Sequence, residues 1–262
     1  MKLNTYLGKP IKGAYEDYLE RNKSSEGRNH SKTISPPSEF LPELVRRNPK
    51  DFIKIPEKSQ VIAKRPDYNN LNWQQALEKS QESNLILPRI DVFMQHYLNL
   101  KEAANGKRPI YDAAGKLIDK DEAKDHWNYL SSTNRKPFNN EVFWTWLDAY
   151  FKKNSNDELY LQTNHRIING QVKSQNISLD QYVESDAYVN LDFNKQGLPK
   201  SISQSKEYVQ GKNIYYWSPV ENGVVRFSAV SDGVYLYCCR YPRGSDPALG
   251  VLLCAEGTRA KK

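Results

Sequence analysis

The spacing of apolar residues predicts three helices in the first half of the chain. Asn72 is a suitable N-cap, because its side chain can accept a hydrogen bond from the first turn, and the helix behind it should span residues 73–83. A second helix should span residues 89–104 and a shorter one residues 120–130. The apolar residues at helical spacing in the first two are Trp73, Ala76, Leu77, Ile90, Phe93, Met94, Tyr97 and Leu98.

From residue 141 onward apolar and polar residues alternate, which is typical of strands because successive side chains point to opposite faces. One more short helix is expected, at residues 179–184. Helices followed by many short strands and loops indicate an α+β domain, with sheets that should be small and antiparallel. The strands are expected at residues 141–151, 159–163, 189–193, 214–217, 224–229 and 234–240.

The first 66 residues differ in composition from the rest of the chain. They carry 14 Lys and Arg against 8 Asp and Glu, so +6 of the net charge of +7 lies there. Polar residues and repeated prolines bury little apolar surface and favour extended backbone. We therefore expect a basic, Pro-rich extension over residues 1–66 and a folded domain over residues 67–262. Such an arm can bind nucleic acid, although it contains no run of basic residues.

The stretch from residue 216 to residue 255 contains all three cysteines and the clearest alternation in the chain. One face of its strand at 234–240 would be small and apolar, and the other would display tyrosines and a thiol. Tyrosine combines a large contact area with a polar tip and few rotatable bonds, so the second face is typical of a binding surface. The inward set is Val234, Leu236 and Cys238, and the outward set is Tyr235, Tyr237 and Cys239.

Motifs that carry catalytic or metal chemistry are missing from the sequence. Three cysteines, two of them adjacent, form neither a disulfide framework nor a metal-binding spacing, and the four histidines are scattered. No phosphate-binding loop, zinc-protease motif or serine-hydrolase motif occurs. We expect no enzyme activity, no cofactor and no metal. No signal peptide or membrane span is visible, so we expect a cytoplasmic or virion-associated location.

A set of tail residues has the order and spacing of a known family. They are Arg226, Phe227, Ala229, Ser231, Val234, Leu236, Cys238, Pro242, Ser245 and the run Ala248-Leu249-Gly250-Val251. With these residues the tail resembles the variable region of proteins diversified by diversity-generating retroelements, above all those of archaea and their viruses. In that family such positions form the fixed scaffold, and the residues between them vary.

An upstream segment carries a second, looser likeness. The run from Trp73 to Ala76, followed by Leu87-Pro88, is similar to the first-helix signature of C-type-lectin-like folds in the formylglycine-generating-enzyme branch. The resemblance covers roughly residues 70–255. It implies a C-type-lectin-like domain with two helices, small antiparallel sheets and much irregular loop.

The composition of the tail supports diversification. These retroelements substitute adenines, typically in Asn codons, and such changes cannot produce Lys, Glu, Gln, Met or Trp. The five types make up 60 of the 262 residues, yet none occurs among the 34 residues from Asn222 to Ala255, where about 8 would be expected. A buried strand-rich segment also avoids Lys, Glu and Gln. Arg and Asp remain in this segment, however, so charge is tolerated and a variable region at about 222–255 is favoured.

We therefore expect a receptor-type protein that binds an unknown macromolecular ligand, in the first place a protein, through a diversified surface. The alternatives are a soluble α+β domain with a nucleic-acid-binding arm, and a formylglycine-generating-type oxidase, although nothing supports a catalytic role for Cys238 or Cys239. The expected scaffold positions are Arg226, Phe227, Ala229, Val234, Leu236, Cys238, Leu249 and Val251. The expected ligand-binding positions are Ser228, Val230, Asp232, Gly233, Tyr235, Tyr237, Cys239, Arg240, Tyr241, Arg243, Gly244 and Asp246.

Overall fold

The computed structural model describes residues 5–6, 9–10, 47–244 and 250–256. The chain divides into two compact units, Met1–Pro37 and Ser38–Lys262. In the first unit the described residues form two short antiparallel strands, β1 (Thr5–Tyr6) and β2 (Lys9–Pro10). The other described elements all belong to the second unit.

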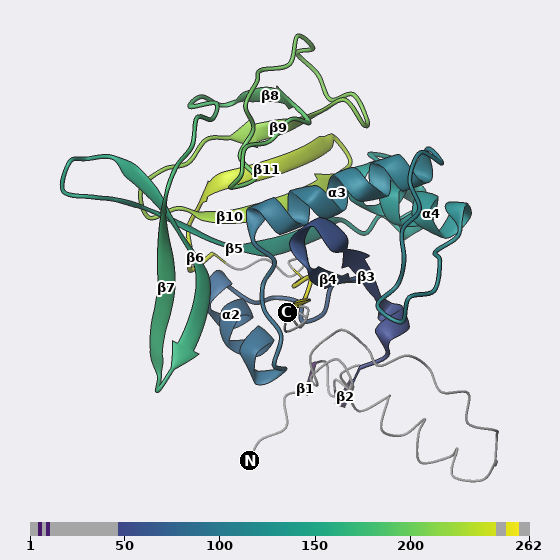
Figure 1. Cartoon of the computed structure of the whole chain (residues 1–262), viewed down its shortest axis with the longest axis horizontal. Coiled ribbons are helices and arrows are strands. Elements are labelled where there is room, and N and C mark those ends of the chain that lie inside the picture. Colours follow the sequence, from purple (N-terminus) through teal and green to yellow (C-terminus); the bar gives the residue numbers. More distant parts are fainter. Residues whose placement is uncertain (1–4, 7–8, 11–46, 245–249, 257–262) are drawn as a thin grey trace, which may run out of the picture. The chain divides into compact units, whose positions relative to one another are not determined.

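A large sheet forms the centre of the second unit (Figure 1). Its strands are β5 (Phe143–Lys153), β6 (Leu159–Ile168), β7 (Gln171–Ser178), β8 (Ala187–Asn190), β9 (Asn213–Trp217), β10 (Val224–Val230) and β11 (Gly233–Arg240). The seven strands lie in the order β7-β6-β5-β10-β11-β9-β8. Neighbours are antiparallel except β9 and β11, which run parallel. The sheet is thus mixed and larger than the small antiparallel sheets expected from the sequence.

The three helices predicted at the front of the chain are present as α2 (Trp73–Glu82), α3 (Ile90–Ala104) and α4 (Lys120–Ser131). Asn72 caps α2, because its side chain accepts a hydrogen bond from the Gln75 backbone at 2.9 Å while the Gln75 side chain accepts one from the Asn72 backbone at 3.0 Å. The described residues therefore hold three α-helices, where the family resemblance implied two.

Aromatic side chains join α3 and α4 to one face of the sheet. The Phe93 ring of α3 lies 4.6 Å from the Phe227 ring of β10 and 6.4 Å from the Phe143 ring of β5. Tyr97, one turn further along α3, lies 5.5 Å from Phe227 and 4.8 Å from Trp127 of α4. Figure 1 shows α3 crossing in front of β10 and β5. Burial of these rings holds the helical layer on the sheet.

A second, three-stranded antiparallel sheet joins two segments that lie far apart in the sequence. It consists of β3 (Phe52–Ile55), β4 (Gln60–Ala63) and β12 (Cys254–Glu256), in the order β12-β4-β3. The folded unit thus begins before residue 67, and the extension expected over residues 1–66 is too long. The apolar pieces at 52–63 are short and separated by Pro56, and their partner β12 is close to the other end of the chain. Six apolar side chains of β3 and β4 are buried: Phe52, Ile53, Ile55, Val61, Ile62 and Ala63.

Residues 179–184 are irregular, so the helix expected there is wrong. The Val183 backbone donates to the Pro199 carbonyl at 2.9 Å, and the Asn194 side chain donates to the Gln181 carbonyl at 3.2 Å. These backbone groups are therefore satisfied by the 194–199 loop rather than by helical hydrogen bonds.

The remaining short elements are three 3₁₀ turns, η2 (Pro49–Asp51), η3 (Pro56–Lys58) and η4 (Lys136–Phe138). No helix of the described residues is long and apolar enough to cross a membrane.

Candidate ligand-binding surface

Strand register gathers a row of aromatic side chains on the sheet face that points away from α3. In each strand these residues alternate with the ones that pack against α3, so they face the opposite way. At the centre, Ser228 of β10 pairs with Trp144 of β5 on one side and with Tyr235 of β11 on the other. Beyond Tyr235 the row continues through Tyr215 of β9 to Tyr188 of β8. Five strands therefore contribute to one row.

A second row crosses the same face with Arg226 at its centre. Arg226 pairs with Trp146 of β5 and Tyr237 of β11, and Tyr237 pairs with Trp217 of β9. The Arg226 guanidinium lies 4.1 Å from the ring centroid of Trp144 and 4.6 Å from that of Tyr237. A planar cation between two aromatic rings is attracted by both. Arg226, expected among the inward scaffold residues, is indeed buried at 4% exposure, but it is buried among these rings.

The rings of the two rows pack against one another. Tyr235 stacks on Tyr237 at 5.5 Å and 19°, and Trp217 stacks on Tyr237 at 6.0 Å and 10°. Such contacts keep the rings in place before any ligand arrives, which lowers the entropy lost on binding. We call this surface the aromatic face; its members, all half-buried, are Trp144, Tyr188, Tyr215, Trp217, Tyr235 and Tyr237.

Charged side chains border the aromatic face at the end of β11. Arg240 is exposed, and its guanidinium lies 5.2 Å from the Tyr237 ring centroid. Tyr241 is 83% exposed, and Arg243 is exposed beyond it. Burial and then a hydrogen bond with Asp232 raise the pKa of Tyr235, so this phenol keeps its proton at neutral pH and donates it to the Asp232 carboxylate.

Most of the expected ligand-binding positions are accessible, and two are not. Ser228 is 1% exposed because large rings flank it in register on both neighbouring strands. Gly233 is buried because the Tyr235 ring lies over it; a Cβ there would come within 3.2 Å of that ring. Asp246 lies outside the described residues. The accessible positions are Val230, Asp232, Tyr235, Tyr237, Cys239, Arg240, Tyr241, Arg243 and Gly244.

The expected scaffold positions are buried wherever they are described. Cys238 is fully buried, and burial raises the pKa of its thiol well above the ordinary value. Cys239 is half-buried, and burial raises the pKa of its thiol as well. Leu249 lies outside the described residues. The buried scaffold residues are Arg226, Phe227, Ala229, Val234, Leu236, Cys238 and Val251.

Three polar atoms on this face are buried without a hydrogen bond in the described part of the chain. They are the indole nitrogens of Trp144 and Trp217 and the hydroxyl of Ser228. A buried polar group without a partner costs about 1–3 kcal/mol.

Comparisons with protein-family models, curated proteins and solved structures find no match for this chain. The candidate site therefore stands on its own geometry. Among the described residues, no three His, Cys, Asp or Glu side chains are grouped so that they could hold a metal ion.

Four members of the aromatic face were not among the sequence-based candidates: Trp144, Tyr188, Tyr215 and Trp217. The sequence predicted a strand at 214–217, so its aromatic residues were visible as one face of that strand. The pattern did not show which strand lies beside it. In the structure β9 pairs in parallel with β11, and β10 separates the two strands in the sequence. Long-range parallel pairing leaves no local signal.

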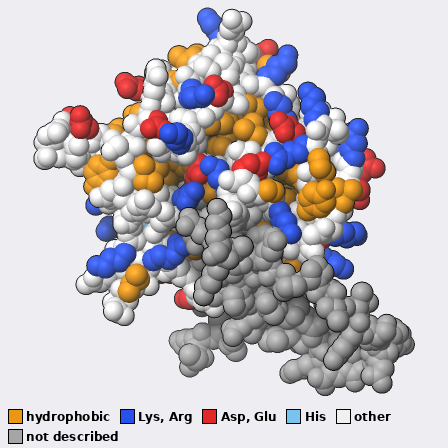
Figure 2. Space-filling view, viewed as in Figure 1, with side chains coloured by type: hydrophobic (Ala, Val, Ile, Leu, Met, Phe, Trp, Pro, Cys, Tyr) orange, Lys and Arg blue, Asp and Glu red, His pale blue; other side chains and the backbone are white. Residues whose placement is uncertain are grey.

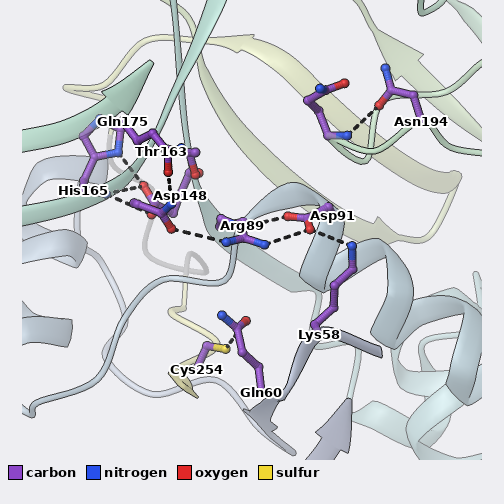
Figure 3. A network of polar contacts seen from close by, with 12 residues as sticks. Lys58, Gln60, Arg89, Asp91, Asp148, Thr163, His165, Gln175, Asn194 and Cys254 are labelled. Atoms are coloured by element: carbon purple, nitrogen blue, oxygen red, sulfur yellow. Dashed lines mark hydrogen bonds and ion pairs between the residues drawn. The ribbon is translucent and has the colours of Figure 1, made fainter. Parts of the chain in front are cut away.

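Apart from the aromatic face, a cluster of polar side chains lies at the junction of β5, β6 and α3 (Figure 3). His165 Nδ1 is 2.5 Å from Asp148 Oδ1, and the two side chains are only 4% and 2% exposed. Arg89 forms a bidentate pair with Asp91, which also accepts from Lys58 at 2.7 Å. The Asp148–His165 pair is buried under Trp73, whose ring meets the imidazole edge-on at 5.0 Å. These contacts tie the elements together, and the buried imidazole is not open to a ligand.

Proposed function

We propose that this chain is a ligand-binding protein that holds its partner on the aromatic face and on the exposed residues at the end of β11. The observation that carries the proposal is the gathering of six half-buried aromatic rings from four strands beside exposed arginines. Tyrosine, tryptophan and arginine are the residues that contribute most to binding at protein interfaces. A soluble domain without a partner seldom leaves so many on one side of a sheet.

We further propose that the C-terminal segment is the variable region of a retroelement-diversified protein with a C-type-lectin-like fold. Within residues 222–255 the half-buried positions and the fully buried ones alternate along β11. Substitutions at exposed positions usually change stability by less than about 0.5 kcal/mol, whereas buried ones cost more. A segment built this way supports many sequences on one fold.

The ligand we propose is a protein rather than a nucleic acid. Nucleobases need free ring faces on which to stack, and here the face of Tyr237 is already used by Arg226, Trp217 and Tyr235. Ring edges with hydroxyl groups suit the mixed polar and apolar surface of a protein. Figure 2 shows the opposite side of the molecule, which carries α3; there Lys and Arg side chains are interspersed with acidic ones rather than gathered in one basic patch.

We assign no catalytic role to the cysteines. A nucleophilic or redox-active cysteine acts as the thiolate, and burial raises the pKa of both Cys238 and Cys239. Both thiols therefore stay protonated at neutral pH. Cys238 serves as a small apolar filler in the core, and Cys239 occupies a displayed position.

Sibling copies of the gene test the proposal. We expect their differences to fall within residues 222–255, at adenine-templated codons, and at accessible positions such as Tyr235, Arg240 and Tyr241. The fully buried Val234 and Leu236 should stay constant. Sequencing the gene's surroundings for a reverse transcriptase and a template repeat provides the measurement. Sibling differences spread evenly over the chain would contradict diversification, although not ligand binding as such.

A further inference from the structure

A cleft of about 680 Å³ adjoins the aromatic face at the start of β5. Its bottom is aromatic, formed by Tyr129, which is buried, and by the half-buried Phe138 and Trp144. Its rim is polar and exposed, with Arg65 and Asn69 on one segment and Glu141 on another. The volume lies within the range of specific ligand sites. Trp144 belongs to both the cleft and the aromatic face, so the two surfaces are continuous.

The aromatic bottom of the cleft is held rigidly. Tyr129 packs edge-to-face on Phe138 with ring centroids 5.3 Å apart. The Arg65 guanidinium lies 4.2 Å from the Tyr129 ring centroid, and the Arg226 guanidinium lies 4.1 Å from that of Trp144. The rings therefore have little freedom to collapse into the space, and the cleft is preformed.

One charged group at the rim of the cleft has no ionic partner in the described part of the chain. Arg65 is exposed and forms no ion pair with a described carboxylate. A ligand that offered a carboxylate to Arg65 would form a charge-assisted pair with it.

We propose that this cleft is an anchor site for an extended segment of a protein partner. One large apolar side chain of the partner, aromatic or leucine-like, occupies the aromatic bottom, and an acidic residue beside it pairs with Arg65. An apolar pocket surrounded by a polar rim is the form that buried anchor residues require at interfaces. The choice of a protein partner rests on the proposed function, whereas the cleft and its chemistry do not.

The position of the cleft has a consequence for specificity. Apart from Gly250, its lining residues lie outside residues 222–255, on the segments 65–69 and 129–144. Diversification would therefore leave the anchor site unchanged while altering the adjoining aromatic face. The cleft would select partners that carry the anchor, and the variable face would distinguish among them.

Selection from a displayed library of random linear peptides against the full chain tests the anchor site. Enriched peptides should share a large apolar residue next to an acidic one, and fluorescence anisotropy then gives their Kd. Arg65→Glu reverses the rim charge, and Asn69→Trp places a large ring at the mouth of the cleft; each should weaken binding by about tenfold or more. Lys107→Glu makes the same charge change at an exposed position after α3 and should leave Kd unchanged.

A double substitution, Arg240→Ala with Tyr241→Ala, separates this proposal from the proposed function. Peptides that lose affinity with Arg65→Glu and Asn69→Trp, but not with the double variant, would support the anchor site and leave the aromatic face without support. The reverse pattern would overturn the anchor site and support the aromatic face. A selection that enriches no peptide with an apolar anchor would also overturn it. Urea unfolding of each variant confirms that all remain folded.

Discussion

Arg226 connects the two parts of the candidate binding surface. Its guanidinium lies between Trp144, which also lines the cleft, and Tyr237, which stacks with its neighbours on the aromatic face. The residue is 4% exposed, so it acts through the rings that it holds rather than by direct contact with a partner. At the residue scale, the arrangement of the rings on the candidate surface depends on the buried Arg226 as well as on the tyrosines themselves.

Arg226→Lys should destabilise the chain by about 1–3 kcal/mol, because an ammonium group cannot lie flat against two rings. Arg243→Lys makes the same change at an exposed position and should fall within about 0.5 kcal/mol of the parent chain. Urea unfolding of the two variants gives the comparison. Equal free energies of unfolding would show that the stacked geometry does not matter.

Because His96 is buried, we expect the folded protein to lose stability in acid. Burial, with His126 nearby, lowers the pKa of His96 to about 3, whereas an unfolded histidine titrates near 6.5. Stability is therefore full above about pH 6.5 and falls as the pH drops from there toward 3, because the unfolded chain binds a proton that the folded chain excludes. By about pH 4.5 this single group should remove about 2–3 kcal/mol.

His96→Gln removes the titrating group while keeping a side chain of similar length. Urea unfolding at about pH 7 and about pH 4.5 should show a difference that is smaller by about 2–3 kcal/mol in the variant than in the parent chain. Part of the pH dependence should remain, because burial also lowers the pKa of His126 to about 4. An unchanged difference would rule His96 out as the source.

At the element scale, β11 carries both the scaffold and the displayed surface. Its residues alternate between full burial and partial exposure from Val234 to Arg240. The alternation was readable from the sequence, and the inward set of Val234, Leu236 and Cys238 is confirmed by full burial. The burial of Ser228 was not readable, since it depends on the size of the residues across β5 and β11.

Alanine substitutions along β11 should therefore differ in their cost. Tyr237→Ala should cost most, about 1–3 kcal/mol, because Tyr237 contacts Arg226, Trp217 and Tyr235. Tyr235→Ala should cost less, and Tyr241→Ala should stay within about 0.5 kcal/mol because Tyr241 is 83% exposed. Thermal and urea unfolding establish the order. A cost for Tyr241→Ala equal to that for Tyr237→Ala would mean that the displayed positions are misassigned.

At the scale of the whole molecule, the two ends of the folded unit meet in one small sheet. Strand β4 lies between β3 and β12, so residues 52–63 are held in place by residues 254–256. The last residues of the proposed variable segment are therefore buried. Val251 to Leu253 and the following Cys254 and Ala255 of β12 belong to the core. The ligand-binding positions that we propose all lie before Gly250.

The limits of the folded unit can be tested by truncation. A chain that starts at Ser38 keeps the whole second unit and should unfold as cooperatively as the full chain. A chain that starts at Asp67 loses the six buried apolar side chains of β3 and β4 and should fail to fold, because each large apolar group contributes about 1.5–3 kcal/mol against a total stability of about 5–15 kcal/mol. Circular dichroism with urea unfolding distinguishes the two; cooperative unfolding of the shorter chain would restore the boundary at residue 66.

The sequence by itself determined the local elements of this protein. Capping residues and apolar spacing located α2, α3 and α4, and period-two alternation located the strands of the tail, because these signals depend on residues a few positions apart. It also identified Tyr235, Tyr237 and Cys239 as the outward side chains of β11, since the inward and outward faces of one strand follow from its own pattern.

Only the tertiary structure decided how these elements assemble. The parallel pairing of β9 with β11 brings Tyr215 and Trp217 beside the displayed tyrosines, and the pairing of β4 with β12 brings residues 60–63 into the core. Both pairings join segments separated by other elements, and their stability comes from shared burial rather than from local periodicity. The outward face of β11 is therefore a property of the sequence, whereas the aromatic face that surrounds it is a property of the fold.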